Sequence, residues 1–315
     1  MTFLTVCLNP TLQKTLVFET LEAGEVNRAR EERLDASGKG VNVTRVLHQL
    51  GEQVVHLTHA GGRERPLFEE LCREDGLALE IVPCEAPLRT CTTLLDRSRG
   101  TTTELIEPTR AVEPGLEARL LNRFRELLPA AGVVVISGSA APGYRDDLFA
   151  RMIAEARGAG CLVVADFRGE PLKLALANDP AQRPQVIKPN LQEFAATFFS
   201  GQQALISEHA TDDATLDRAR EVMGDLARSG VRVVLTRGVN PVLFLDDEGM
   251  LREAPAIPLE PVNTIGCGDA FTAGFAATLA REEDFALAIE AGHAAAAMNA
   301  VLLKPGSIRE SSLDR

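Results

Sequence analysis

The chain has 315 residues, of which 45% are apolar, and this is enough to bury one large core or two of ordinary size. Its 45 acidic residues outnumber its 33 basic ones, which gives a formal net charge of -12 at pH 7. A surface of this sign repels a phosphate backbone and disfavours nucleic-acid binding, although a local basic pocket can still hold a phosphate.

The cysteines and the N-terminus bear on where the protein works. The six cysteines contain no CxxC pair, and no cluster of histidines accompanies them. This argues against a zinc site and a disulfide framework, so reduced thiols and a cytoplasmic location are expected. The apolar N-terminus runs at once into Asn9-Pro10 without a basic segment, which favours a first strand over a signal peptide. No apolar stretch reaches the ~18 residues of a membrane span.

Short β-rich runs alternate with helical patterns along the chain. The runs are nearly continuous in apolar residues, as is typical of strands covered on both faces. They are Phe3–Leu8, Val54–Ala60, Val133–Ser137, Cys161–Asp166, Val186–Lys188 and Val231–Thr236. Between them, Val43–Leu50 and Leu116–Leu127 repeat apolar residues every three or four positions. This alternation predicts an α/β fold, with a mostly parallel central sheet and helices on both faces.

Two regions, Thr15–Ser37 and Arg89–Ile106, break the alternation because they show no clean helical face. The second contains Arg97-Ser98-Arg99-Gly100, which is typical of a hairpin turn. We expect both regions to form antiparallel strands outside the main sheet, which together make a small lid. The alternative is that they are two irregular surface excursions.

The strongest local motif is Gly266-Cys267-Gly268-Asp269, which opens an apolar helix that continues to Leu279. Glycines let backbone amides approach an anion, and a helix N-terminus favours negative charge. Asp269 has two interpretations: it satisfies the first-turn amides, or it acts as a base beside an anion hole. Cys267 is the one candidate for a reactive thiol at this helix start, and the alternative is a small inert filler.

A second glycine motif, SGKGVN, spans 37–42 and precedes the helical pattern at Val43–Leu50. It resembles part of a Walker A loop but fails two of its requirements. Arg33 occupies the first glycine position, and Gly40 stands where Ser or Thr should follow the lysine. Two interpretations stay open, an anion site built from Lys39 and loop amides, or a solvent-exposed turn.

Three further motifs follow predicted strands, at the strand ends where open α/β sheets bind ligands. They are KPNLQE at 188–193, SGSAAPG at 137–143 and TRG at 236–238. In the first of these, Asn190 and Glu193 have a plain structural interpretation as the capping box of a helix.

Taken in order, NP at 9–10, SGKGVN, SGS at 137–139, KPNLQE and GCGD closely resemble the PfkB (ribokinase-like) family of carbohydrate kinases. The chain looks most similar to the phosphosugar branch of 1-phosphofructokinases and tagatose-6-phosphate kinases, of which GEVNR at 24–28 is also typical. The resemblance covers essentially the whole chain. It implies a single ribokinase-like α/β domain over 1–315, with a small β-sheet lid from inserted strands at about 12–36 and 88–107, and usually a homodimer through that lid.

The resemblance also implies ATP and Mg²⁺ as cofactors and a role for each motif. Asp269 matches the base that deprotonates the acceptor hydroxyl, and the amides of Gly266, Cys267 and Gly268 match the hole for the transferring phosphoryl group. Positions that match contacts to the acceptor are Gln13, Gly38, Lys39, Asn42, Arg89, Ser137 and Asp269 itself. Positions that match the nucleotide site are Lys188, Asn190, Glu193, Thr236, Arg237, Gly238, Gly268 and Asn299. Asn190 and Glu193 also match residues that organise Mg²⁺ indirectly, through water and phosphates.

The chain departs from the family pattern at three of these positions. Ser37 replaces the usual first glycine, and Cys267 replaces an alanine while the backbone amides remain. Gln13 replaces an aspartate that accepts hydrogen bonds from sugar hydroxyls. Because Gln13 is neutral and longer, the identity of the sugar and of the phosphorylated hydroxyl stays open.

The expected activity is therefore phosphoryl transfer from MgATP to a hydroxyl of a sugar phosphate, without nucleic-acid or membrane partners. Lys39 and Arg89 favour a phosphorylated acceptor, because two cations would have no role beside a neutral sugar. One alternative is a kinase of an unphosphorylated sugar or nucleoside. Another is a catalytically silent ligand-binding relative, against which the intact Asp269, Asn190 and Glu193 argue.

Overall fold

The computed structural model describes residues 1–199 and 213–309. Within these ranges, seven strands form one sheet in the order β11-β10-β9-β8-β1-β4-β5, and all neighbouring pairs are parallel. The strands are Thr2–Cys7 (β1), Gln53–Gly61 (β4), Ala78–Cys84 (β5), Val133–Ser137 (β8), Leu162–Asp166 (β9), Val186–Ile187 (β10) and Arg232–Val233 (β11). The predicted parallel sheet is confirmed, and β5 is an edge strand that the sequence patterns did not reveal.

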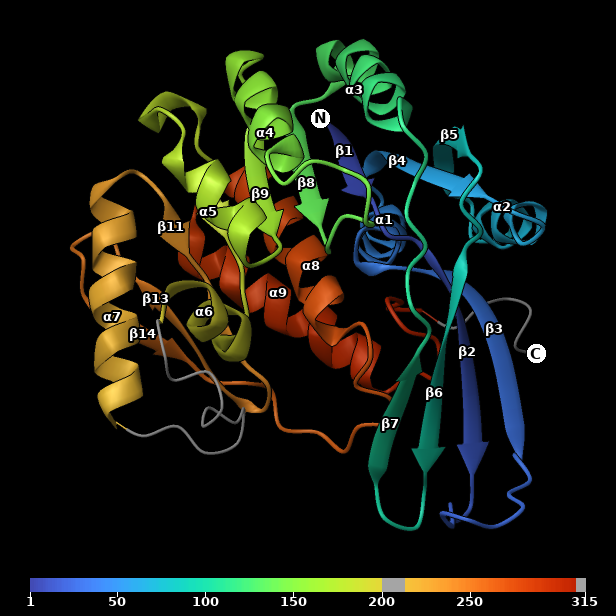
Figure 1. Ribbon diagram of the computed structural model, residues 1–315. Helices are drawn as coiled ribbons and strands as arrows, with labels where there is room; N and C mark the ends of the chain where they lie inside the picture. The colour runs from blue at the N-terminus through green and yellow to red at the C-terminus, as the bar shows by residue number, and fades with distance from the viewer. Residues whose placement is uncertain (200–212, 310–315) are drawn as a thin grey trace.

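Helices cover both faces of this sheet, as predicted (Figure 1). They are Lys39–Gln49 (α1), Arg65–Glu74 (α2), Leu116–Leu127 (α3), Leu148–Gly158 (α4), Glu170–Ala177 (α5), Leu191–Phe198 (α6), Asp213–Arg228 (α7), Cys267–Glu282 (α8) and Phe285–Ala300 (α9). In β8, Val134 and Ile136 pack into the core under α3 and α4, whereas Val133 and Val135 pack against α1 and α8. No helix in the described part of the chain is long and apolar enough to cross a lipid bilayer.

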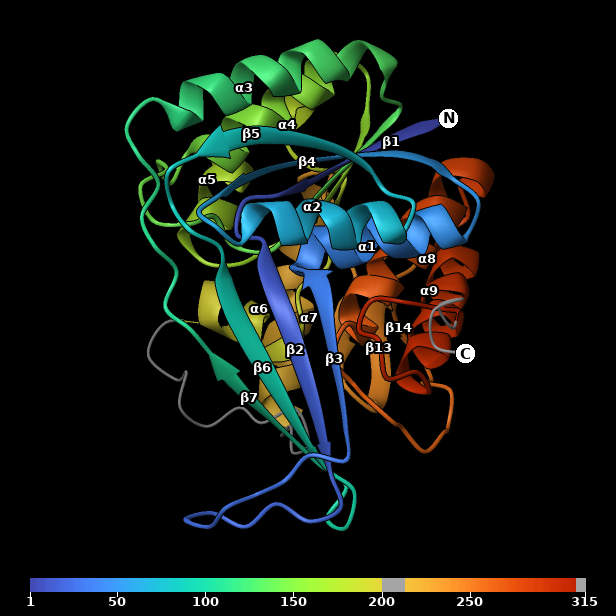
Figure 2. The same ribbon diagram turned by 90° about the vertical axis from the view of Figure 1, so that its right-hand side faces the viewer.

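Four strands form a separate sheet that projects from the body, and we call it the lid sheet (Figures 1 and 2). Its order is β3-β2-β6-β7, with the bounds Glu31–Ser37 (β3), Thr11–Phe18 (β2), Arg89–Asp96 (β6) and Thr101–Ile106 (β7). The small separate sheet and its β6–β7 hairpin are as predicted. The expectation of antiparallel pairing alone was wrong, because β2 and β6 pair in parallel. β2 follows β1 along the chain, and β6 follows β5. Because β1 and β5 run in the same direction, β2 and β6 both leave the main sheet at the carboxyl ends of its strands and run parallel to each other.

A third sheet corrects the prediction of one strand over Val231–Thr236. Arg232–Val233 joins the main sheet, whereas Leu235–Arg237 (β12) pairs antiparallel with Asn240–Leu245 (β13), which in turn pairs with Leu251–Ala254 (β14). The neighbouring strand β10 runs into Pro189, and a proline cannot donate to a strand ladder. The regular parallel ladder is therefore interrupted at Pro189, and beyond it only one parallel bridge, between Asn190 and Thr236, continues the pairing while β12 turns to β13.

The direction of the chain across the main sheet reverses between β1 and β8. From β1 the chain moves through β4 to β5, and from β8 it moves the opposite way through β9 and β10 to β11. In open α/β sheets such a switch point leaves a crevice at the carboxyl ends of the strands, where ligands bind. The loops after β1 and β8 meet there, since Asn9 Nδ2 donates to Ser139 Oγ over 3.2 Å.

Candidate active site

The motif Gly266-Cys267-Gly268-Asp269 forms the start of α8, as predicted. Gly266 caps the helix with φ 84°, and a Cβ at this position would lie 2.2 Å from the Gly306 backbone nitrogen, so only glycine fits. The Cys267 amide already donates to the Thr264 carbonyl (3.3 Å). The amides of Gly266 and Gly268 make no hydrogen bond within the described chain, so they are free to bind an anion at this helix start.

Asp269 lies in the first turn of α8 and is 7% exposed. Asn42 Nδ2 donates to its Oδ2 over 2.8 Å. Burial raises the pKa of Asp269 to about 7 and the negative charge of Asp166 adds to this, although Lys39, Asn42 and Lys188 act in the opposite direction. A carboxyl that titrates near neutral pH is suited to accept a proton from a hydroxyl.

Asp166, at the end of β9, is a buried member of the site that the motifs did not predict. Its Oδ2 accepts hydrogen bonds from Ser137 Oγ and Thr272 Oγ1, both over 3.1 Å. Burial alone would raise its pKa, but the ammonium groups of Lys188 and Lys39 and the two hydroxyls lower it below its usual value. One signal could have found it, because an acidic residue ends a predicted strand beside the ligand-binding edge.

Lys39 begins α1 and reaches across the crevice. Its Nζ lies 2.9 Å from Glu193 Oε1 and 3.7 Å from Asp166 Oδ1. Burial would lower the pKa of Lys39, but the carboxylates of Asp166, Glu193 and Asp269 raise it above its ordinary value. Lys188 joins the same cluster, with Nζ 3.4 Å from Asp166 Oδ1. The structure thus gathers both lysines beside the start of α8, rather than bringing Lys39 to Arg89.

The KPNLQE motif forms the capping box that its spacing indicates. Asn190 Oδ1 accepts from the Glu193 amide (2.8 Å), and Glu193 Oε2 accepts from the Asn190 amide (3.1 Å). The second oxygen of Glu193 holds Lys39. Glu193 therefore caps α6 with one carboxylate oxygen and binds the Lys39 ammonium with the other. Its role as a helix cap does not exclude a role in the active site.

The carboxylates present fit a magnesium ion that is held largely by phosphates. The described residues contain no group of three or more His, Cys, Asp or Glu side chains placed to hold a metal. Magnesium usually binds one or two carboxylates together with waters and substrate phosphates. Glu193 and the Asp166 Oδ1 atom, which is buried without a hydrogen-bond donor in the described structure, match that pattern.

The structure also shows the contacts of other residues that were predicted to bind the nucleotide. Thr236 forms a β-bridge with Asn190, which brings the two strand-end motifs together. Arg237 turns away, because its Nε donates to the Pro241 carbonyl (2.7 Å). Asn299 is fully buried and donates to the Ile265 carbonyl (3.0 Å), so it supports the turn before α8. Its contact with adenine, like the nucleotide role of Gly238, stays a prediction.

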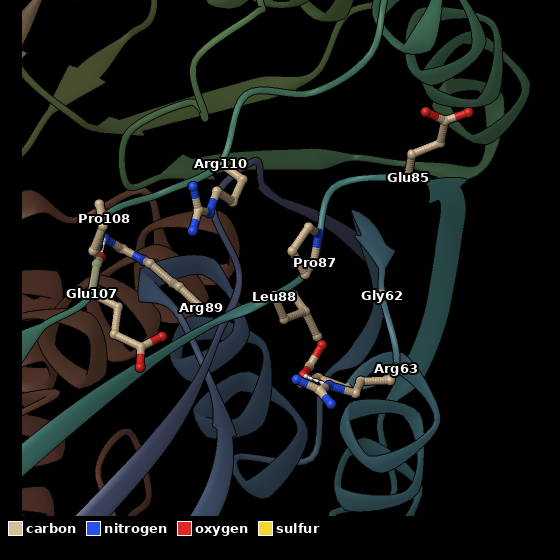
Figure 3. Close-up of a pocket in the computed structure, with 10 residues that line it drawn as sticks. Gly62, Arg63, Glu85, Pro87, Leu88, Arg89, Glu107, Pro108 and Arg110 are labelled. Carbon is tan, nitrogen blue, oxygen red and sulfur yellow. Dashed lines mark hydrogen bonds and ion pairs between the residues drawn. The ribbon is translucent and has the colours of Figure 1, made fainter.

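Two predicted acceptor residues belong to the lid sheet. Gln13 is buried and donates from Nε2 to Thr93 Oγ1 over 2.7 Å. Arg89 lines a cavity of about 730 Å³ where the lid sheet meets the body (Figure 3). The other lining residues are Gly62, Arg63, Glu64, Glu85, Pro87, Leu88, Glu107, Pro108 and Arg110. Arg89 therefore lies at the junction of the lid sheet and the body, whereas Gln13 is not among the residues that line this cavity.

Arg110 is a cavity residue that the motifs did not predict. Both Arg110 and Arg89 line the cavity, where the Arg89 guanidinium lies beside Glu107 and Pro108 and its Nη1 donates to the Glu107 carbonyl over 3.5 Å (Figure 3). Neither arginine forms an ion pair with a carboxylate within the described chain. The preceding Thr109 donates to Asn9 Oδ1 (3.2 Å), and Asn9 in turn holds Ser139, so this cavity adjoins the loop after β8. A single arginine in an irregular segment has no sequence signal of its own.

Comparison with known proteins agrees with this geometry. The model of the family described as pfkB family carbohydrate kinase matches residues 10–311. The chain belongs to the pfkB family. A 1-phosphofructokinase from Xanthomonas campestris pv. campestris is 32% identical over 277 residues, which are 88% of this chain and 83% of that protein. The predicted family and its carbohydrate-kinase class are therefore confirmed.

Solved structures share the pfkB fold of this chain. A possible 1-phosphofructokinase from Thermotoga maritima superposes with a TM-score of 0.85 at 22% identity, over 96% of this chain and 93% of that one. Escherichia coli phosphofructokinase-2 in complex with fructose-6-phosphate gives a TM-score of 0.79 at 21% identity, over 96% and 95%. At these identities the likeness concerns the fold, and it confirms the ribokinase-like architecture.

Proposed function

We propose that this pfkB-family kinase transfers a phosphoryl group from MgATP to a hydroxyl of a sugar phosphate, as 1-phosphofructokinases and tagatose-6-phosphate kinases do. The observation that carries the proposal is the placement of Asp269. A buried carboxyl with a pKa of about 7 lies directly beside a helix start with free amides and a cluster of two lysines. Base, anion hole and positive charge are the three elements that phosphoryl transfer to an alcohol requires.

Each residue then has a defined task. Asp269, oriented by Asn42, takes the proton of the acceptor hydroxyl. The amides of Gly266 and Gly268 and the Lys39 ammonium stabilise the negative charge of the phosphoryl group in transit. Glu193 and Asn190 would hold Mg²⁺ through water, together with Asp166 Oδ1, and the ion supplies charge neutralisation for the nucleotide phosphates when it is bound.

The cavity beside the lid sheet supports a phosphorylated acceptor. Arg89 and Arg110 present guanidinium groups without carboxylate partners, and the buried Arg89 Nε has no hydrogen-bond acceptor in the described structure. Two of the lining glutamates are engaged, since Glu64 pairs with Arg63 and Glu107 accepts from the Thr90 amide. Guanidinium groups bind phosphate through paired, charge-assisted hydrogen bonds, so a phosphate satisfies both arginines where a neutral sugar does not.

An acceptor panel tests the proposal. ADP release is measured with ATP and fructose 1-phosphate, fructose 6-phosphate, tagatose 6-phosphate, neutral sugars and nucleosides. We expect a sugar phosphate to be the efficient acceptor. A preference for a neutral acceptor would support the sugar or nucleoside kinase instead, and binding without turnover of any acceptor would support the silent relative.

Arginine variants test the acceptor phosphate site separately. Arg89→Ala and Arg110→Ala should each raise the KM of the sugar phosphate by about tenfold or more and leave the KM of ATP unchanged. Arg63→Ala is the matched control, because Arg63 lines the same cavity but is already paired with Glu64. An unchanged acceptor KM in both test variants would remove the support for a phosphorylated substrate.

A cytoplasmic homodimer completes the proposal. All six cysteines are free, which suits a reducing compartment. Pairing through the lid sheet is supported by exposed apolar side chains on that sheet, among them Leu105 and Ile106.

A further inference from the structure

Arg45 of α1 is fully buried, and no larger side chain in the described chain is buried so completely. A buried guanidinium is unfavourable unless its donors are satisfied, so its partners indicate what it holds. Its Nε donates to Asp75 Oδ2 (2.7 Å), and Nη2 donates to the Ala36 carbonyl. Nη1 donates to Asn42 Oδ1 and to the Pro305 carbonyl, both over 3.1 Å.

The contact to Asn42 determines which end of that amide faces Asp269. Asn42 Oδ1 accepts from Arg45 and also from Ser37 Oγ (3.1 Å), which leaves the Nδ2 group to donate to Asp269. A hydroxyl can rotate to donate or accept, so Ser37 alone would permit either orientation. The guanidinium can only donate, and a flipped amide would place its NH₂ group against it and its oxygen against the Asp269 carboxylate.

The same guanidinium also reaches the turn before α8. Nη1 lies 3.4 Å from the Gly306 carbonyl in addition to that of Pro305. Gly306 is wedged between two site elements, because a Cβ on it would lie 2.3 Å from Asn42 Cβ, and a Cβ on Gly266 would lie 2.2 Å from the Gly306 nitrogen. Arg45 therefore holds the segment against which the Gly266 turn packs.

The positive charge of Arg45 is neutralised by Asp75, which is not among the residues of the candidate active site. Asp75 pairs with Arg45 and with Lys304, and Lys304 Nζ also lies 3.5 Å from Asp35 Oδ1. Arg45, Asp75, Lys304 and Asp35 thus form a row of ion pairs with alternating charges. Any effect of Arg45 on Asp269 consequently runs through the orientation of Asn42, and not through direct charge.

We propose that Arg45 is a positioning residue of the phosphoryl transfer, which fixes the Asn42 amide toward Asp269. The proposal rests on the function inferred above, in which Asp269 is the base. Arg45 itself touches neither substrate nor reacting atom.

Arg45→Lys is the test variant, because it keeps the positive charge beside Asp75 but cannot span the acceptors that the planar fork reaches. We expect kcat to fall by about ten- to hundredfold, while the KM of MgATP stays within about twofold. The matched control is Asp75→Asn, which keeps an acceptor for Arg45 Nε but removes the balancing charge and the acceptor of Lys304. It should lower the melting temperature and leave kcat within about twofold.

A double-variant cycle separates positioning from a general loss of stability. If Arg45 acts through Asn42, Arg45→Lys combined with Asn42→Ala should be no slower than Asn42→Ala alone, within about twofold. Additive losses in kcat would overturn the proposal, because they would mean that the two residues act independently.

Side-chain NMR provides a readout that needs no turnover. In protein labelled with ¹⁵N-asparagine, the Asn42 amide signal is assigned by its absence in Asn42→Ala. Its protons should exchange slowly with solvent in the native protein and rapidly in Arg45→Lys. Rapid exchange in the native protein, or unchanged protection in Arg45→Lys, would contradict the proposal, and the first of these can be measured even if the variant does not fold. Retained turnover in Asp269→Asn would instead contradict the proposed base, so the two failures are distinguishable.

Discussion

At the scale of single residues, two buried carboxyl groups of one site have pKa values that are shifted in opposite directions. Asp166 and Asp269 are both buried, but Asp166 lies beside two ammonium groups and keeps a pKa below its usual value. Asp269 has one amide donor and the negative Asp166 nearby, and burial dominates its pKa. Such a divergence separates a permanently charged anchor from a group that exchanges protons near neutral pH.

The first prediction concerns the pH dependence of turnover. Asp269 must be ionised to accept a proton, so kcat/KM should decline as the pH falls through about 7, the value to which burial raises its pKa. Asp269→Asn should lower kcat by roughly 10²–10⁴-fold and leave MgATP binding largely intact. Initial rates from pH 5 to 9 and calorimetry with MgATP check both parts. Turnover of the variant within a few-fold of the native rate would refute the assignment.

Gln13 is the residue at which substrate choice is expected to depart from the family. Its NH₂ group is committed to Thr93, whereas an aspartate would offer acceptors to sugar hydroxyls. We expect the native protein to use fructose 1-phosphate and tagatose 6-phosphate poorly, and Gln13→Asp to raise kcat/KM for at least one of them by about tenfold. Gln13→Asn is the control for side-chain length. Efficient native turnover of fructose 1-phosphate without a gain on substitution would leave Gln13 as a neutral replacement.

The structure also favours one of the two interpretations of Cys267. The helix start suggested a reactive thiolate at Cys267, but burial raises the pKa of this thiol, and the hydrogen bond that Asn299 donates to its sulfur (3.3 Å) only partly opposes this. A helix N-terminus stabilises a thiolate only where the sulfur is partly exposed and not desolvated. The inert-filler interpretation therefore fits Cys267 better.

At the scale of elements, Glu193 of α6 both caps the helix and forms an ion pair with Lys39. Glu193→Gln keeps an oxygen that can accept from the Asn190 amide but removes the charge beside Lys39, whereas Glu193→Ala removes both. We expect the Gln variant to retain the melting temperature and the Ala variant to lose about 1 kcal/mol of stability. Both should need more Mg²⁺ for half-maximal rate. Equal Mg²⁺ requirements in native and Gln proteins would limit Glu193 to its capping role.

At the scale of the whole molecule, the lid sheet is the element most exposed to partners. Leu16 and Leu94 are register partners, and the partner of Thr92 is Leu105, so the three leucines share one face of the sheet. Leu105 is 54% exposed, and all of β7 is exposed at the sheet edge. An apolar face beside an open strand edge favours pairing with a second copy.

We therefore predict a homodimer in solution that depends on this face. Leu105→Asp should convert it to a monomer in sedimentation-velocity or light-scattering experiments, because the change buries a charge in an apolar contact. Thr102→Asp, on the opposite face of the same strand, is the control and should remain dimeric. A native protein that is monomeric at high concentration would contradict lid-mediated pairing.

What the sequence determined by itself is local. The turn at Gly266–Asp269, the capping box of Asn190 and the β6–β7 hairpin were predictable because each depends on hydrogen bonds and backbone angles within a few residues. The alternation of strands with helices likewise determined a parallel sheet, since crossover connections permit little else.

Only the tertiary structure decided how these parts combine. Lys39 meets Glu193 across 154 residues, and Arg110 stands in no recognisable motif, so spacing could not reveal these contacts. The position of Asp166 at a strand end was a signal, but its two lysine partners come from distant segments. The parallel pairing of β2 with β6 follows from where β1 and β5 end in space. The pKa of Asp269 is likewise a tertiary property, because desolvation depends on which distant segments cover a carboxyl and not on its neighbours in the chain.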